Sequence, residues 1–256
     1  MCLIFFALNQ HPRYKLIVAA NRDEFYARKT APAHFWEDHP QILGGRDLEA
    51  SGTWMAMNKN GRISLVTNYR DPANINPKAP SRGQLVSDFL VNVDTPQEYL
   101  SKVFERAAQY NGFNLLTGYP DELWYLSNYR EGIQKLERGV YGLSNHLLDS
   151  PWPKVHRGKE KFSNAITNSI IETDALFELL YDEERALDDL LPETGIGLER
   201  ERALSSMFIK TKGYGTRCST VILVSHDNQV VFSERVYELD TFAHKTNKFQ
   251  FTISND

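Results

Sequence analysis

Cys2 is the residue of this chain with the clearest capacity for chemistry, and an apolar run, Leu3-Ile4-Phe5-Phe6, follows it. Methionine aminopeptidase removes Met1 when the next residue is small, so we expect processing to leave a free α-amino group on Cys2. The ordinary pKa is about 8.5 for a thiol and about 7.7–8.0 for an α-amino group, and a nearby ammonium favours the reactive thiolate. A nucleophile beside an N-terminal amine is an established arrangement for covalent catalysis. The alternative is that Cys2 is only a small residue of a buried strand.

A second polar group, Asn21-Arg22-Asp23-Glu24, follows the apolar run at 14–20. Residues 2–8 and 14–20 are predicted to form a hairpin, because both runs favour strands and a turn segment with Asn9 and Pro12 separates them. In an antiparallel pair the end of the second strand lies beside the start of the first, so Asp23 is expected near Cys2. The alternative interpretation of the four residues is a solvated turn.

Two amide side chains stand at the ends of later strands. The runs at 53–57 and 62–69 flank Asn60-Gly61, which is a strong hairpin signal, and the second run leads to Asn68. A shorter run from 140 ends at Asn145. Side-chain amides stabilise the oxyanion of a tetrahedral intermediate by roughly 3–4 kcal/mol per donor. Cys2, Asp23, Asn68 and Asn145 are therefore the predicted catalytic residues, for attack of the thiolate on an amide or ester carbonyl.

The predicted placement of these residues follows from the order of the elements, in which strand pairs alternate with helices along the chain. That order predicts an α+β protein in which two mainly antiparallel sheets pack face to face under helices, a four-layer αββα arrangement in one domain spanning 1–256. Residues 30–52 are expected to be irregular because they contain two prolines and three glycines. Helices are predicted at 85–90, 95–107 and within 153–208, short strands at 113–117, 123–126, 133–136 and 140–145, and a third hairpin at 218–224 and 229–237.

Composition excludes several classes of function. The 256 residues carry a net charge of −4, so nothing favours nucleic acid as a partner. The two cysteines, Cys2 and Cys218, make neither a disulfide framework nor a zinc cluster. No apolar run approaches the roughly 20 residues that span a bilayer, and the start lacks the basic leader of a signal peptide. A cytoplasmic protein with no transmembrane segment is expected.

Eight short motifs, in order along nearly the whole chain, resemble the NRDE family, which includes the transport and Golgi organisation proteins. Ala50-Ser51-Gly52 stands where that family usually has a Gly-Gly pair. The motifs are Met1-Cys2 with its strand, residues 21–24, Gly45-Arg46-Asp47, Gly52-Thr53-Trp54, the runs 65–70 and 81–83, Gly142-Leu143-Ser144-Asn145, and the run 215–220.

The NRDE family is in turn similar to N-terminal-nucleophile hydrolases of the choloylglycine hydrolase and penicillin acylase type, which share an αββα fold. The resemblance implies Cys2 as nucleophile, Asp23 as the residue that holds the α-amino group, Asn68 as an oxyanion donor and Asn145 as a second amide. The arginine of the hydrolases' Arg-Asn-x-Asp segment does not match, because Ala20 stands at that position and Arg22 is displaced by two residues.

The arginines of these motifs are candidates for binding an acidic group of the substrate, because a guanidinium pairs well with carboxylate or phosphate. The predicted substrate-binding residues are Arg22, Arg70, Arg82 and Arg217, and Arg46 belongs to the same set of motifs. The alternative is a set of ion pairs with Asp23, Glu24, Asp47 and Asp71 that shape the loops.

The resemblance also implies a second class of function. The Golgi-organisation branch is associated with haem trafficking and lipid metabolism, so the alternative to a hydrolase or acyltransferase is a non-enzymatic carrier or chaperone for haem or a lipid-like molecule. A third hypothesis is that the chain is a structural or interaction protein that has inherited a hydrolase fold. No cofactor is expected for the hydrolase. For the carrier, His34, His39 and His146 are candidate axial ligands, although loop histidines are usually only solvated.

Overall fold

The computed structural model describes residues 2–254 and places the chemistry-bearing start of the chain inside a seven-stranded antiparallel sheet. The strand order is β10-β1-β2-β12-β13-β14, and β11 pairs with β12. The strands are β1 (Cys2–Leu8), β2 (Tyr14–Phe25), β10 (Gly139–Leu143), β11 (Lys210–Thr211), β12 (Tyr214–Ser225), β13 (Gln229–Tyr237) and β14 (His244–Thr252).

The second sheet also has seven strands, and each follows its neighbour directly, in the order β3-β4-β5-β6-β7-β8-β9. All of its pairs are antiparallel. Its strands are β3 (Thr30–Phe35), β4 (Ile42–Asp47), β5 (Met55–Asn58), β6 (Ile63–Asn68), β7 (Phe113–Tyr119), β8 (Glu122–Ser127) and β9 (Gln134–Lys135).

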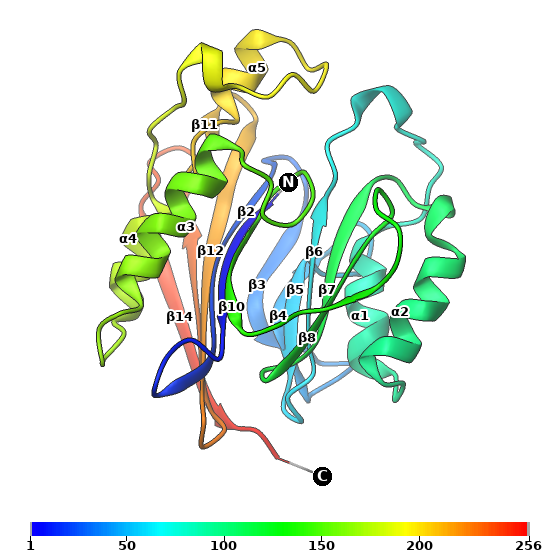
Figure 1. Cartoon of the computed structure of the whole chain (residues 1–256), viewed down its shortest axis with the longest axis vertical. Helices are drawn as coiled ribbons and strands as arrows, with labels where there is room; N and C mark the ends of the chain where they lie inside the picture. Colours follow the sequence, from blue (N-terminus) through cyan, green and yellow to red (C-terminus); the bar gives the residue numbers. More distant parts are fainter. Residues whose placement is uncertain (1, 255–256) are drawn as a thin grey trace.

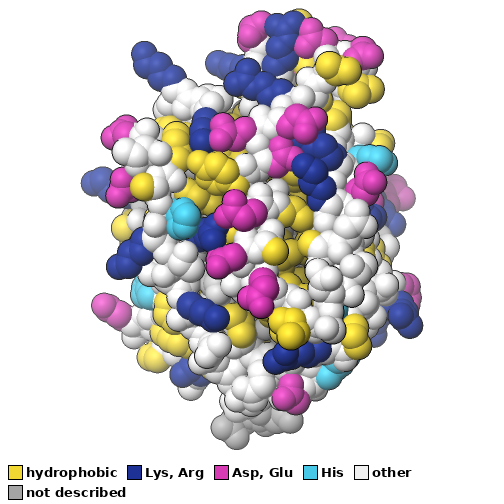
Figure 2. Space-filling model, turned by 90° about the vertical axis from the view of Figure 1, so that its left-hand side faces the viewer, with side chains coloured by type: hydrophobic (Ala, Val, Ile, Leu, Met, Phe, Trp, Pro, Cys, Tyr) yellow, Lys and Arg dark blue, Asp and Glu magenta, His cyan; other side chains and the backbone are white. Residues whose placement is uncertain are grey.

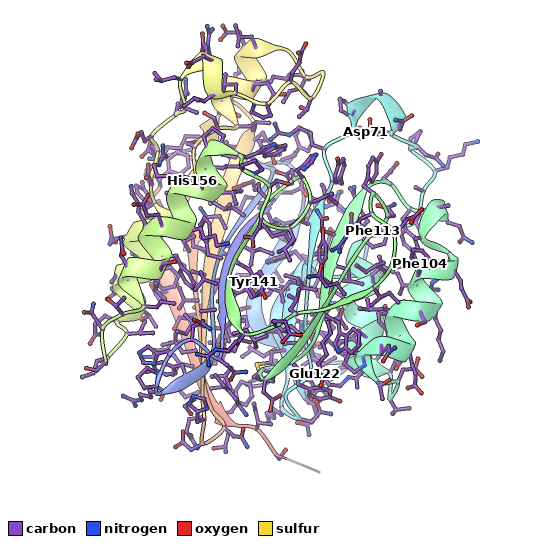
Figure 3. All side chains as sticks on the ribbon, in the orientation of Figure 1. Asp71, Phe104, Phe113, Glu122, Tyr141 and His156 are labelled. Atoms are coloured by element: carbon purple, nitrogen blue, oxygen red, sulfur yellow. The ribbon has the colours of Figure 1, made fainter. Side chains whose placement is uncertain are left out.

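The sheets face each other, and the central strands alternate between two buried environments. In β1, Ile4 and Phe6 belong to the core between the sheets, whereas Leu3 and Phe5 belong to the core under the helices. Successive side chains of a strand point to opposite faces, so a sheet covered on both faces needs nearly continuous apolar strands. Side chains fill the space between the two sheets in Figure 3.

Helices complete the four layers (Figure 1). The first sheet is covered by α3 (Pro153–Ala165) and α4 (Thr173–Leu180), and the second by α1 (Gly83–Val91) and α2 (Pro96–Glu105). A short helix, α5 (Leu198–Ala203), lies beyond the end of β11. The predicted αββα arrangement is confirmed.

The remaining helical segments are single turns of 3-10 helix at Pro72–Asn74, Ala107–Gln109 and Asp188–Leu190. Over residues 2–254 no helix has the length and apolar character needed to cross a membrane. Figure 2, which views the molecule from the side of α3 and α4, shows acidic and basic side chains interspersed over that face.

Three predictions about the elements were wrong. Residues 30–52 contain two strands. Pro32 is tolerated in β3 because β3 is an edge strand with a register shift, and Gly44 and Gly45 lie in β4 where neighbouring atoms leave no room for a side chain. The second strand does not end before the polar group at 21–24, because β2 continues to Phe25. The strand β14 was not predicted, since it is an edge strand with mostly exposed polar residues.

Candidate active site

Cys2 faces Arg22 across the antiparallel pair of β1 and β2. Its side chain points between the sheets, like that of Ile4. The Arg22 side chain is only 5% exposed and stacks on the indole of Trp54 at 4.1 Å. Its Nη1 atom has no hydrogen-bond partner among the described residues, and the nearest carboxylate oxygen in an ion pair, that of Glu24, is 3.9 Å from Nη2. A buried guanidinium with an unused donor therefore lies beside the thiol.

The cavity beside Cys2 is small. Its volume is about 10 Å³, which is enough for about one water molecule. Ala20, Trp54, Met55 and Val66 contribute to its walls, together with Cys2, Ile4, Asn21, Arg22 and Thr220. Trp54, which is half-buried, is the least buried large side chain of the wall.

Burial raises the pKa of the Cys2 thiol, and the charges around it act in both directions. The Asp23 and Glu24 carboxylates raise this pKa further, while the Arg22 guanidinium lowers it. The thiolate is therefore favoured only if its stabilisation by nearby cations exceeds the cost of removing water from its negative charge.

Asp23 is fully buried on the helix side of β2. The hydroxyl of Thr216 donates to its Oδ1 atom at 2.7 Å, and the same hydroxyl accepts the backbone N–H of Ile209 at 2.9 Å. Burial raises the pKa of Asp23, and the Lys154 ammonium lowers it. The predicted closeness of Asp23 to Cys2 is borne out by the strand register, and the solvated-turn alternative is wrong for Asn21, Arg22 and Asp23.

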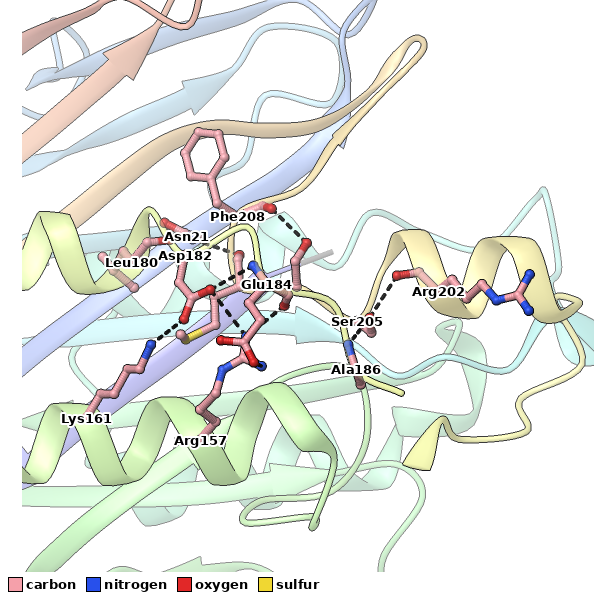
Figure 4. Close-up of polar contacts among 12 residues, drawn as sticks. Asn21, Arg157, Lys161, Leu180, Asp182, Glu184, Ala186, Arg202, Ser205 and Phe208 are labelled. Atoms are coloured by element: carbon pink, nitrogen blue, oxygen red, sulfur yellow. Dashed lines mark hydrogen bonds and ion pairs between the residues drawn. The ribbon is translucent and has the colours of Figure 1, made fainter. Parts of the chain in front are cut away.

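Asn21 has a structural role. Its amide donates to the carbonyl oxygens of Leu180 and Met207, each at 2.9 Å, and its Oδ1 accepts the Ser219 hydroxyl at 2.5 Å. Figure 4 shows this residue beside the segment that runs from α4 toward α5. Asn21 thus holds the helix layer to the sheet, and its side chain does not point toward Cys2.

The two predicted amides lie together at the ends of β6 and β10. Asn145 is fully buried, and its Nδ2 atom donates to the backbone carbonyl of Asn68 at 3.0 Å. Its neighbour Ser144 donates from its hydroxyl to the carbonyl of Cys2 at 3.3 Å. The amide of Asn68 makes no hydrogen bond within residues 2–254, so it is the better placed of the two to donate to an oxyanion. Asn145 instead connects the strand ends to each other.

The four predicted substrate-binding arginines have different environments. Arg70 forms an ion pair with Glu201 at 2.6 Å and packs over Trp152. Arg82 donates to the carbonyl of Gly112 at 2.9 Å.

Arg217 donates to two backbone carbonyls, those of Phe25 and Arg28. Arg22 alone lines the cavity beside Cys2. The loop-shaping alternative holds for Arg46, which pairs with Asp38 at 2.6 Å, and for Arg70, although their partners are not the predicted acids.

Lys154 is a site residue that sequence reasoning missed. It is 2% exposed in the first turn of α3, and its Nζ atom donates to the carbonyl of Leu204 at 2.9 Å. Burial lowers its pKa to about 8, and the Asp23 carboxylate acts against that shift. The available signal was weak, because one lysine at the start of a charged helix looks like a surface residue.

A second buried acid was also missed. Glu234 is 1% exposed on β13, and its carboxylate accepts the backbone N–H of Ala33 in the other sheet at 2.6 Å. Burial raises its pKa to about 7, against the influence of Arg22 and His34. Cys218, which faces Arg22 from the β12 side, is also near Glu234, and burial holds the pKa of its thiol well above the ordinary value.

The histidines proposed as haem ligands do not meet at the site. The Nδ1 atom of His34 lies 2.8 Å from the carbonyl of Pro32, and that of His146 lies 2.6 Å from the Ser150 hydroxyl. Neither these two nor His39 lines the cavity beside Cys2. Within the described residues no group of three or more histidine, cysteine or acidic side chains is arranged to hold a metal ion.

The sequence and the fold of this chain are similar to those of known proteins. The family model described as Transport and Golgi organisation 2 matches residues 1–239. The mouse Transport and Golgi organization 2 homolog and its human counterpart are each 37% identical to this chain, over the full length of both sequences. A solved structure of a Caenorhabditis elegans N-acylethanolamine-hydrolyzing acid amidase ortholog is 11% identical, with a TM-score of 0.50 over 87% of this chain and 92% of that one. This likeness confirms the predicted N-terminal-nucleophile hydrolase-like fold.

Proposed function

The chain belongs to the Transport and Golgi organisation 2 family, and on that premise we propose that it is an amidohydrolase or acyltransferase that acts on a C–N amide or ester bond through an acyl-Cys2 intermediate. The observation that carries the proposal is the placement of Cys2 opposite the buried, stacked guanidinium of Arg22. Such a cation stabilises a thiolate in a site from which water is largely excluded.

The proposed reaction has two halves. In the first, the Cys2 sulfur attacks the carbonyl carbon, a C–S bond forms, and the carbonyl oxygen becomes an oxyanion that accepts a hydrogen bond from the Asn68 amide. The intermediate collapses when the C–N or C–O bond breaks, and the leaving amine or alcohol takes up the proton that the thiol gave to the α-amino group. In the second half, water or another nucleophile attacks the thioester and releases the acyl group from Cys2.

Asp23 and Arg22 support the reaction in different ways. The Asp23 carboxylate, held by Thr216, balances the charge of an ammonium at the start of β1. The Nη1 atom of Arg22 faces a cavity beside the thiol and can donate to a polar atom of the substrate. The proposed substrate is a small acyl compound. Arg70, Arg82 and Arg217 can bind an acidic group of this substrate only if they release their present ion-pair or hydrogen-bond partners.

Intact mass spectrometry tests the proposal on protein expressed without an N-terminal tag. A sample that has lost one methionine is incubated with p-nitrophenyl acetate and p-nitrophenyl octanoate. We expect one acyl group per chain on the wild type and on Cys218→Ala, and none on Cys2→Ala. Retention of Met1, or equal acylation of Cys2→Ala, would remove the proposed mechanism.

A carrier for haem or a lipid-like molecule is the second candidate, and one observation favours it. Burial raises the pKa of Cys2, which keeps the thiol in the form that is the poorer nucleophile. Haem titration followed by absorbance separates the two candidates. A saturable shift that is lost in His34→Ala or His146→Ala supports the carrier, and an unchanged haem spectrum removes haem as the ligand.

A further inference from the structure

The first sheet ends at β14, on the opposite side of the sheet from β10 (Figure 1), and the outer edge of β14 has no neighbouring strand. β14 pairs with β13 from His244 to Thr252 without a register shift. It contains no proline, and none of its nine residues is buried. A long, regular edge strand presents a row of unpaired N–H and C=O groups, which is a template for pairing with another chain.

Hydrogen bonds at the two ends of the β13–β14 pair show which backbone groups point outward. The N–H of Glu238 donates to the carbonyl of Ala243 at 2.8 Å, and the N–H of Ile253 donates to the carbonyl of Asn228 at 2.9 Å. In an antiparallel pair, residues that bond to the neighbouring strand alternate with residues whose backbone groups point away from it. The odd-numbered residues of β14 therefore bond to β13, and the even-numbered residues direct their N–H and C=O groups outward.

Ser254 marks the place where the free edge ends. Its N–H donates to the carbonyl of Lys59, in the turn between β5 and β6, at 3.0 Å, as expected for an even-numbered residue. From His244 to Thr252 the outward backbone groups have no hydrogen-bond partner within residues 2–254. The free edge thus has the full length of β14.

The other edges of the two sheets are protected. In β10, the N–H of Gly142 donates to Oδ1 of Asp149 at 2.8 Å, and its carbonyl accepts the N–H of Asp149 at 2.8 Å. In β3, Pro32 lacks an N–H, and the N–H of Ala33 donates to Glu234 across a register shift. β9 and β11 have only two residues each. Over the part of the chain that the structure describes, β14 is the one long edge without such protection.

The side chains of β14 indicate what kind of strand fits beside it. Phe249 and Phe251 are half-buried at the margin of the core between the sheets, where their rings lie 6.0 and 6.1 Å from that of Phe35. The even-numbered residues, such as Lys248 and Gln250, are exposed on the other face. An added strand should therefore be apolar on one face and polar on the other, which is the pattern of β14 itself.

We propose that β14 pairs antiparallel with β14 of a second copy of this chain, so that the first sheet continues across a two-fold axis into the partner. Such an interface is self-complementary, because the same surface is used by both copies. Each copy supplies outward N–H and C=O groups on its even-numbered residues, so these residues face one another across the axis. The proposal goes beyond the chemistry of Cys2 and does not depend on it.

Charge selects the register of this pairing. Full overlap of the two strands would set Lys248 opposite Lys248, and like charges directly opposite each other are unfavourable. A register that sets Phe249 opposite Phe249 avoids this contact, because Lys248 then lies opposite Gln250 of the second copy. The Phe249 pair is of the kind without hydrogen bonds, in which side chains approach most closely, so the two rings extend the apolar layer across the axis.

Sedimentation velocity on the full chain tests the proposal at concentrations from about 2 to about 200 µM, which bracket the Kd of a weak interface. We expect the mass to rise from that of one chain toward that of two. Gln250→Pro removes an outward N–H from each copy and should weaken the dimer by about tenfold or more. Proline is tolerated there because the bonds to β13 come from the odd-numbered residues. The matched control, Gln250→Ala, keeps the N–H and should dimerise like the wild type.

A cysteine introduced at the axis tests the register. In a background with Cys2→Ser and Cys218→Ser, Phe249→Cys should form a disulfide between two copies on mild oxidation, seen by electrophoresis without reductant. Lys245→Cys, on the same face of β14 but opposite Ile253 of the second copy, should not.

Single-chain mass at every concentration would overturn the proposal, and so would a dimer that Gln250→Pro and Gln250→Ala form equally well, since it would use another surface. If Gln250→Pro does not fold, the comparison of the two cysteine variants decides. Equal crosslinking of Phe249→Cys and Lys245→Cys would then count against the pairing of β14 with its copy.

Discussion

Cys2 and Arg22 are direct neighbours across the β1–β2 ladder, and Cys218 faces the same arginine from the β12 side. The two thiols thus flank one guanidinium, two strands apart, which is about 10 Å at the usual strand spacing. A disulfide needs Cα atoms within about 7 Å, so this register keeps the cysteines apart. Arg22 is positioned to act on Cys2 electrostatically although the sequence places it twenty residues away.

Removal of the Arg22 charge should slow the reactions of Cys2. The guanidinium lowers the pKa of the thiol, and an opposite charge at close range is worth one pKa unit or more. Arg22→Met should therefore reduce the rate of Cys2 alkylation at pH 7 by about tenfold, while Arg22→Lys should keep most of the rate. The rates with iodoacetamide are measured by mass spectrometry in a Cys218→Ser background, and an Arg22→Met variant that reacts as fast as wild type contradicts this role.

The central strands of the fold were predictable, because each of their faces is buried. The runs at 2–8, 14–20 and 218–224 consist mostly of apolar residues and are largely buried on both faces, as a sheet covered on both faces requires. The edge strands β3 and β14 were not predictable, since exposed polar residues and prolines in an edge strand resemble a loop.

The candidate site was predictable only in part. Adjacent strands of a hairpin place Asp23 near Cys2 from the sequence alone. Lys154 and Glu234 come from elements whose packing partners lie far away in the sequence, so no local pattern identifies them as buried. The opposition of Cys2 and Arg22 depends on β2 continuing through its polar residues, which a burial pattern in the sequence does not reveal.

Contact between the helix layer and the first sheet should be sensitive to one methyl group. A Cβ atom added at Gly158 in α3 would lie 2.1 Å from Cζ of Phe5 and 2.6 Å from Sδ of Met207. Gly158→Ala should lower the free energy of unfolding by about 1–3 kcal/mol, although alanine is the better helix former by about 1 kcal/mol. Urea unfolding measures the change. The control is Asn164→Ala at an exposed position of the same helix, and a Gly158→Ala protein as stable as that control contradicts the packing argument.

The two amides should differ when each is replaced by alanine. Asn68→Ala should reduce the acylation rate by about 10²–10³-fold, as for other oxyanion donors, with little effect on stability because its amide bonds to no described residue. Asn145→Ala should instead lower the free energy of unfolding by about 1–3 kcal/mol, because it leaves the carbonyl of Asn68 without its donor. Acylation kinetics and urea unfolding on both variants separate these roles, and identical effects would contradict the division.

Glu234 should make the protein less stable as the pH rises from about 4.5 to about 7. Burial raises its pKa from 4.5 to about 7, so the folded protein binds this proton more tightly than the unfolded chain does. Its contribution to stability is fully present below the unfolded pKa and is lost as the pH rises through the folded one. A difference of about 2.5 units corresponds to about 3 kcal/mol of unfolding free energy. Asp23, whose pKa is also raised, adds a slope of the same sign.

Glu234→Gln removes the titration and can still accept the backbone N–H of Ala33 through its amide oxygen. The free energy of unfolding, measured in urea at pH 5 and pH 8, should therefore fall less with pH in Glu234→Gln than in wild type, by about 2.5 kcal/mol. Glu131→Gln, at an exposed position, is the matched control and should keep the wild-type slope. An unchanged slope in Glu234→Gln would mean that the carboxylate stays ionised beside Arg22, and that the bond from β13 to β3 holds at every pH in this range.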